Sequence, residues 1–102
     1  MAYHSVISAN VVAVDATTPV KAVTSPSERR TTLVINNTTT GLLYAKVQNV
    51  GGSAPSAANM TTGFMRTYTV PVEAALTLEF EGAVDVYLHA VAPGSVYVTE
   101  VC

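Results

Sequence analysis

Alternation of apolar and polar residues, repeated along most of the chain, is the feature that most constrains the fold. It is clearest in two neighbouring stretches, Leu76–Phe80 and Val84–Ala90. A period of two is the strand period, and apolar residues on one side only indicate a sheet with a core face and a solvent face. The chain also contains 17 Val and 14 Thr, β-branched residues that fit a pleated surface better than a helix.

Further stretches with strand character divide the rest of the chain. We expect them at residues 5–14, 20–24, 30–36, 42–47, 63–70 and 96–101. Their spacing is typical of a sandwich or barrel, and no segment has a helical period. The longest break, Gly51–Asn59, has the composition of a flexible loop. The sequence therefore predicts an all-β fold: one antiparallel β-sandwich or jelly roll of seven to eight strands, forming a single domain over residues 1–102.

The same alternation predicts which side chains meet. Leu76–Phe80 and Val84–Ala90 are expected to form a hairpin across a turn at Glu81-Gly82, with Leu33 and Ile35 on the opposing sheet. The apolar row would then hold Leu76, Leu78, Phe80, Val84, Val86 and Leu88, and the polar face of the second strand would hold Asp85, Tyr87 and His89.

Charge limits the classes of partner. Only 12% of the residues are charged, about half the usual share, which suggests surface that is covered in an assembly. The net charge is −2, and Arg29-Arg30 is the one adjacent basic pair. A nucleic acid or an anionic membrane would favour a basic stripe, so neither is expected as a partner. No apolar run reaches the length of a membrane span.

Catalytic and metal-binding patterns are weak. The two histidines, His4 and His89, accompany no nucleophile motif, so we expect no enzyme activity and no catalytic residue. Glu79, Glu81 and Asp85 form a small acidic group that could hold a cation, but no calcium-type loop surrounds them. We interpret the group as a solvated or interface face and predict no metal and no cofactor. The lone Cys102 is interpreted as a free thiol rather than an intermolecular disulfide.

Five residues are the predicted interface. Tyr44, Tyr87 and Tyr97 lie opposite apolar rows, and tyrosine supplies contact area with a polar tip. Arg29 and Arg30 at a strand entrance could meet acidic groups of a neighbour. The rival interpretation of the tyrosines is a carbohydrate platform, which the absence of tryptophan weakens.

The first ten residues alternate less clearly than the other strands. Residues 1–10 could therefore form an N-terminal arm that adds an edge strand to a neighbouring subunit. The competing interpretation is an ordinary first strand, folded into its own sandwich.

Three segments carry a family resemblance: Arg29–Asn37, Leu43–Val47 and Val84–Glu100. They contain an Arg-x-x-Leu-x-Ile-x-Asn strand, an aromatic-centred strand, a Val-Tyr-x-x-Ala strand and a final Val-x-Val-x-Glu strand. This order resembles small β-sandwich virion proteins of tailed bacteriophages.

The resemblance implies a non-enzymatic capsid decoration, or cement, protein. Such a protein is made in the host cytoplasm, sits on the outer surface of the capsid, often as a homotrimer, and braces the major capsid protein. A tail or head-fibre component of the same kind of virion is the alternative. A carbohydrate-binding or adhesion module is an alternative of another class.

Overall fold

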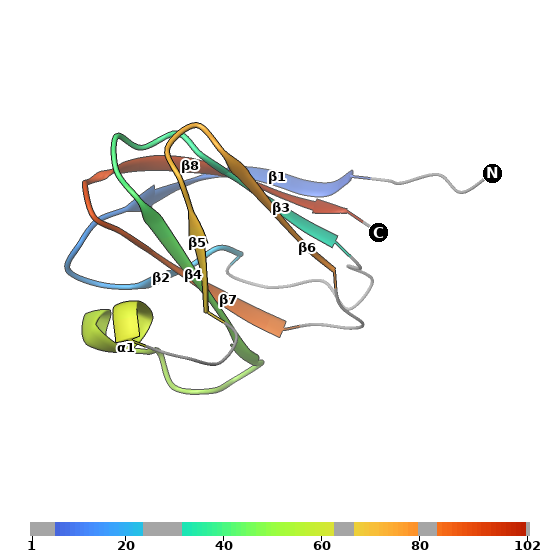
Figure 1. The fold of residues 1–102 in the computed structure, drawn as a ribbon. Coiled ribbons are helices and arrows are strands. Elements are labelled where there is room, and N and C mark those ends of the chain that lie inside the picture. Colours follow the sequence, from blue (N-terminus) through green and yellow to red (C-terminus); the bar gives the residue numbers. More distant parts are fainter. Residues whose placement is uncertain (1–5, 24–31, 63–66, 80–83, 102) are drawn as a thin grey trace.

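The computed structural model describes residues 6–23, 32–62, 67–79 and 84–101. Within these ranges the chain forms eight strands and one short helix (Figure 1). The elements are β1 (Val6–Val14), β2 (Val20–Lys21), β3 (Thr32–Asn37), β4 (Leu43–Asn49), α1 (Ala57–Thr62), β5 (Thr67–Val70), β6 (Ala75–Glu79), β7 (Val84–Ala90) and β8 (Gly94–Val101). The predicted all-β class is confirmed, and the predicted strands match those observed to within a few residues at their ends.

The strands form two four-stranded antiparallel sheets packed face to face (Figure 1). Sheet 1 has the order β1-β8-β3-β6, and sheet 2 has the order β2-β7-β4-β5. Every link between successive strands crosses from one sheet to the other, except the link from β4 to β5. This strand order is that of a jelly roll, in which two Greek keys interlock.

The core fills the space between the sheets, and alternation decides which residues enter it. On β3, Leu33 and Ile35 are fully buried while Thr32, Val34 and Asn36 are only half-buried. β4 follows the same rule as predicted, with Leu43, Ala45 and Val47 inside and Tyr44 and Lys46 outside. The other buried apolar residues of this cluster are Val14, Ala22, Val70, Leu78, Val86, Leu88, Ala90, Val96 and Val98.

The predicted hairpin between β6 and β7 is wrong. β6 pairs with β3 in sheet 1, where Leu78 lies opposite Leu33 and Leu76 opposite Ile35. β7 lies in sheet 2 between β2 and β4. These apolar residues still meet, because the two sheets pack face to face across the core. Alternation determines which side of a strand is buried, whereas the strand with which it pairs depends on segments distant in sequence. Phe80 and the predicted turn lie outside the described residues.

Asp85, Tyr87 and His89 lie on the side of β7 away from the core cluster, as predicted, but this side is buried rather than exposed. α1 packs against β4 and β7, and its Met60 is fully buried although it lies outside the core cluster. Asp85, Tyr87 and His89 are all buried; the backbone of Gly51 contacts Asp85, and that of Ala16 contacts His89. α1 begins inside the predicted flexible loop Gly51–Asn59, so residues 57–59 are helical rather than part of a loop. A six-residue helix is too short to show a helical period in sequence.

Asn37 fastens one end of the sandwich. Its side-chain nitrogen donates to the backbone oxygens of Gly41, Val70 and Pro71, at 2.9, 2.9 and 3.2 Å. Its side-chain oxygen accepts from the backbone nitrogen and the hydroxyl of Thr39, at 3.0 and 2.6 Å. One buried amide thus joins the end of β3 to the approach to β4 and the exit from β5, so it ties sheet 1 to sheet 2.

Candidate interaction surface

The outer face of sheet 1 is nearly free of charge. It is built by the residues that alternate with the core rows of four strands, and none of its described side chains is fully buried. We call these residues the sheet-1 face: Ala9, Val11, Ala13, Thr32, Val34, Asn36, Ala75, Thr77, Glu79, Ser95, Tyr97, Thr99 and Val101. Glu79, on the β6 edge, is its one charged member, so the face offers small, β-branched and aromatic groups to a partner.

The two large apolar side chains that are most exposed on this face form a cross-strand pair. Val11 of β1 lies directly opposite Tyr97 of β8, and their exposures are 61% and 54%. A shallow hollow of about 270 Å³ beside them is lined by Ala9, Val11, Tyr97 and Thr99 among others. Exposed aromatic side chains are enriched at the centres of protein interfaces.

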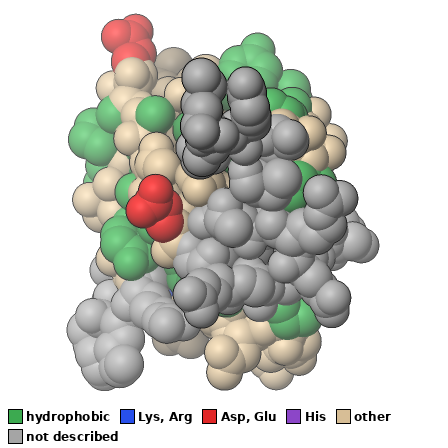
Figure 2. Space-filling view, turned by 90° about the vertical axis from the view of Figure 1, so that its right-hand side faces the viewer, with side chains coloured by type: hydrophobic (Ala, Val, Ile, Leu, Met, Phe, Trp, Pro, Cys, Tyr) green, Lys and Arg blue, Asp and Glu red, His purple; other side chains and the backbone are tan. Residues whose placement is uncertain are grey.

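The end of the sandwich where β1 begins and β8 ends has a different character. In Figure 2 the hydrophobic side chains of the described residues on this side lie in several small groups, and two acidic side chains are visible. Exposed apolar side chains also occur here, at Val6 and Ile7 at the start of β1, and elsewhere at Val50, Tyr68, Val72 and Val91.

The predicted interface residues separate into three groups. Tyr97 is exposed on the sheet-1 face, as the alternation predicted. Tyr44 is half-buried on the other sheet, with its ring centroid 6.1 Å from that of His89. Tyr87 is only 5% exposed, so it offers almost no surface to a partner and its prediction as an interface residue is wrong. Arg29 and Arg30 lie outside the described residues.

Among the described residues, β1 is one of the two edge strands of sheet 1, and β6 is the other. Its residues Val6–Val14 pair with β8 of the same chain, with a register shift between Val6 and Ser8. For residues 6–10 the structure therefore shows an ordinary first strand rather than an arm detached from its own sandwich; residues 1–5 lie outside the described ranges. The strand contains no charged residue and no proline, although both commonly protect an edge against pairing with other chains.

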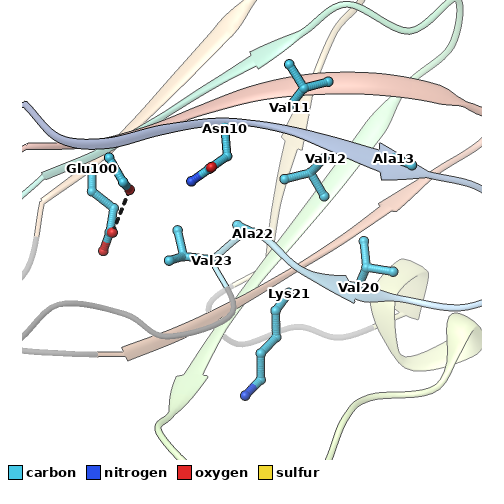
Figure 3. Close-up of a pocket in the computed structure, with 10 residues that line it drawn as sticks. Asn10, Val11, Val12, Ala13, Val20, Lys21, Ala22, Val23 and Glu100 are labelled. Carbon is cyan, nitrogen blue, oxygen red and sulfur yellow. Dashed lines mark hydrogen bonds between the residues drawn. The ribbon is translucent and has the colours of Figure 1, made fainter.

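A groove of about 590 Å³ runs between β1 and the segment around β2 (Figure 3). Its apolar lining includes Val12, Val20 and Val23. At one end Ser8 donates a 2.7 Å hydrogen bond to Glu100, while Lys21 points away from the groove (Figure 3). The sequence did not predict this groove, because its two walls come from strands that belong to different sheets. The one signal in the sequence was a pair of polar residues, Ser8 and Asn10, in the inward-facing row of β1.

Asp85 has a structural explanation. It is 1% exposed, and its Oδ2 accepts a 3.1 Å hydrogen bond from the backbone nitrogen of Gly51. Lys21 Nζ lies 3.7 Å from the same oxygen. Gly51 has a φ of 83°, a left-handed conformation that glycine adopts at little cost. A buried carboxylate is kept by such partners, so Asp85 anchors the segment that leads into α1.

His89 is likewise held by a neighbouring loop. Its Nε2 lies 3.0 Å from the backbone oxygen of Ala16, and the backbone nitrogen of Ala90 donates to the oxygen of Asp15. The Asp15 carboxylate accepts from the backbone nitrogens of Thr18 and Thr17, which lower its pKa, and the nearby His89 lowers it further. These contacts fasten the β1–β2 loop over β7.

The acidic group predicted as one face is divided by the fold. Glu79 is exposed on β6 in sheet 1, whereas Asp85 is buried on β7 in sheet 2; Glu81 lies outside the described residues. Among the residues the structure describes, no three metal-binding side chains gather. Within the same ranges, no helix has the length and apolarity needed to cross a membrane.

The chain was compared with protein-family models, with curated proteins and with solved structures. No family model, curated protein or solved structure matches it. What the chain does must therefore be argued from its fold and from the sheet-1 face.

Proposed function

We propose that the chain is a non-enzymatic virion structural protein, a capsid decoration or cement protein that self-associates and braces a phage head. The observation that carries the proposal is the sheet-1 face, an accessible sheet surface with an exposed Val11–Tyr97 pair and Glu79 as its one charge. A face of this kind suits permanent contact with a neighbouring protein better than it suits solvent.

The fold and the sequence resemblance support the same proposal. Jelly rolls recur in viral capsid proteins and in lectins, although a fold alone does not determine function. The resemblance to phage virion proteins favours the first of these two classes. In the proposed role, the sheet-1 face lies against the major capsid protein, and weak contacts repeated over many symmetric copies add up to a firm attachment.

A carbohydrate-binding module is the second candidate, and the groove between β1 and β2 favours it. That groove combines apolar walls with the polar groups Ser8, Asn10 and Glu100, a mixture that small ligands require. A saturable change in intrinsic tyrosine fluorescence on adding sugars, lost in Asn10→Ala, would favour this candidate over the capsid role.

The first test is the mass of the isolated chain. We expect a homo-oligomer, because the chain has few charges and an exposed apolar pair, and a trimer is the assembly that the resemblance implies. Light scattering at micromolar concentration should give a multiple of the 10.6 kDa chain mass. A mass of one chain across a hundredfold concentration range would contradict self-association.

The second test is binding to phage heads assembled without this chain. Tyr97→Glu places a charge at the centre of the sheet-1 face and should reduce binding in a sedimentation assay about tenfold or more, as for an interface anchor. Tyr68→Glu is the matched control, because Tyr68 is also exposed but lies on β5 in the other sheet. Equal binding by both variants would remove the sheet-1 face from the capsid contact, and binding to tails instead of heads would favour the tail or fibre role.

A further inference from the structure

The free edge of β1 differs from the other sheet edges of the described chain. β6 carries Glu79, β2 carries Lys21, and β5 has four residues. β1 has nine residues with no charge and no proline, and its register is regular from Ser8 to Val14. A long uncharged edge presents unpaired backbone groups and is a template for another strand.

We propose that this edge pairs with β1 of a second copy, antiparallel across a two-fold axis, so that two copies of sheet 1 form one continuous sheet. The inference rests on the self-association in the proposed function and assigns a surface to it. Like charges that lie directly opposite each other on two strands repel; β1 carries no charge, so a second copy meets no such repulsion along this edge.

The register follows from the alternation of side chains. Residues directly opposite each other in an antiparallel pair point to the same side of the sheet, so outer residues of one copy must face outer residues of the other. An axis through Val11 satisfies this condition and uses the whole regular segment Ser8–Val14. Val11 then meets Val11 of the second copy, and Ala9 meets its Ala13, so apolar groups face apolar groups along the outer row.

The contact has consequences for assembly. An isologous contact closes after two copies, so it joins one proposed trimer to the next, or forms a dimer by itself. Seven residues on each side are fewer than the roughly 20–30 of a standard interface; a single contact is therefore weak and gains strength by repetition over a shell. Pairing also joins two sheet-1 faces into one surface of double width, with Glu79 of each copy as its only charged member.

A single engineered cysteine tests the pairing. Opposite Cα atoms in an antiparallel pair lie about 4.5–5.5 Å apart, which is within the range that a disulfide spans. In a Cys102→Ser background, Val11→Cys should form a disulfide-linked dimer under mild oxidation, with a yield at least about fivefold above that of Thr77→Cys. Thr77 is the matched control because it is exposed on the same face but on β6. Equal yields would overturn the proposal.

A second pair of variants tests the register. Ala9→Cys and Ala13→Cys, both in the same background, should cross-link when mixed, whereas Ala9→Cys alone should give several-fold less dimer, because its two copies lie four residues apart along the strand. A reversed result would overturn the axis through Val11. An oligomeric mass without any Val11→Cys dimer overturns the edge pairing but leaves the proposed function; a Val11→Cys dimer without head binding supports the pairing and contradicts the capsid role.

Discussion

Replacing Leu88 with alanine is expected to lower the free energy of unfolding by about 2–5 kcal/mol, the usual cost of a large-to-small change in a core. Leu88 is fully buried on β7, a central strand of sheet 2, and belongs to the cluster between the sheets. The loss has two parts: apolar surface that is no longer buried, and the cavity that remains. The cavity persists because strands held in two packed sheets cannot easily move to fill it.

Chemical denaturation measures this effect. A domain of this size has a total stability of about 5–15 kcal/mol, so the variant should unfold at a clearly lower urea concentration. Val91→Ala is the matched control, because Val91 is an exposed residue just after the same strand, and it should change the stability by no more than about 0.5 kcal/mol. Similar losses for the two variants would mean that β7 does not lie in the core as described.

Replacing Asn37 with aspartate is the second large effect that we expect. The change keeps the shape of the side chain but replaces its NH₂ group with an acceptor, which would then face the backbone oxygens of Gly41, Val70 and Pro71. A buried carbonyl that loses its donor, as the Val70 oxygen would, costs about 1–3 kcal/mol, and the buried charge of the new carboxylate adds to this cost. We therefore expect a loss of at least about 3 kcal/mol at neutral pH.

The control for Asn37 is Asn49→Asp, the same chemical change at an exposed position at the end of β4. It should leave the unfolding transition within about 0.5 kcal/mol of the parent. The Asn37→Asp protein should also recover stability on mild acidification, because protonation removes the buried charge and restores one donor. A variant as stable as Asn49→Asp would show that the amide does not hold the two sheets together.

The strands were predictable because their signal is local. The bounds of β7, Val84–Ala90, and the inward side of β3 and β4 follow from alternation alone. The burial of Asp85 and His89 on the outer side of β7 was not predictable, because it depends on contacts with Gly51 and Ala16, which are distant in sequence. A six-residue helix in a stretch rich in Gly, Ser and Ala has no period to detect.

The candidate surface was partly predictable for the same reason. The outward position of Tyr97 follows from the alternation in β8, and the structure agrees. Its pairing with Val11 requires the knowledge that the first and last strands are neighbours, which only the complete topology provides. The free edge of β1 and the groove beside it depend on that topology in the same way.

The central claim is that this jelly roll is a structural component on the outside of a phage head. A cryo-electron microscopy map of the assembled particle tests it most directly, at a resolution that separates strands about 4.8 Å apart. The account predicts density for two four-stranded sheets on the outer surface of the head, with Val11 and Tyr97 against capsid subunits. Density for the chain in the tail or its fibres, or a particle that lacks the chain altogether, would contradict it.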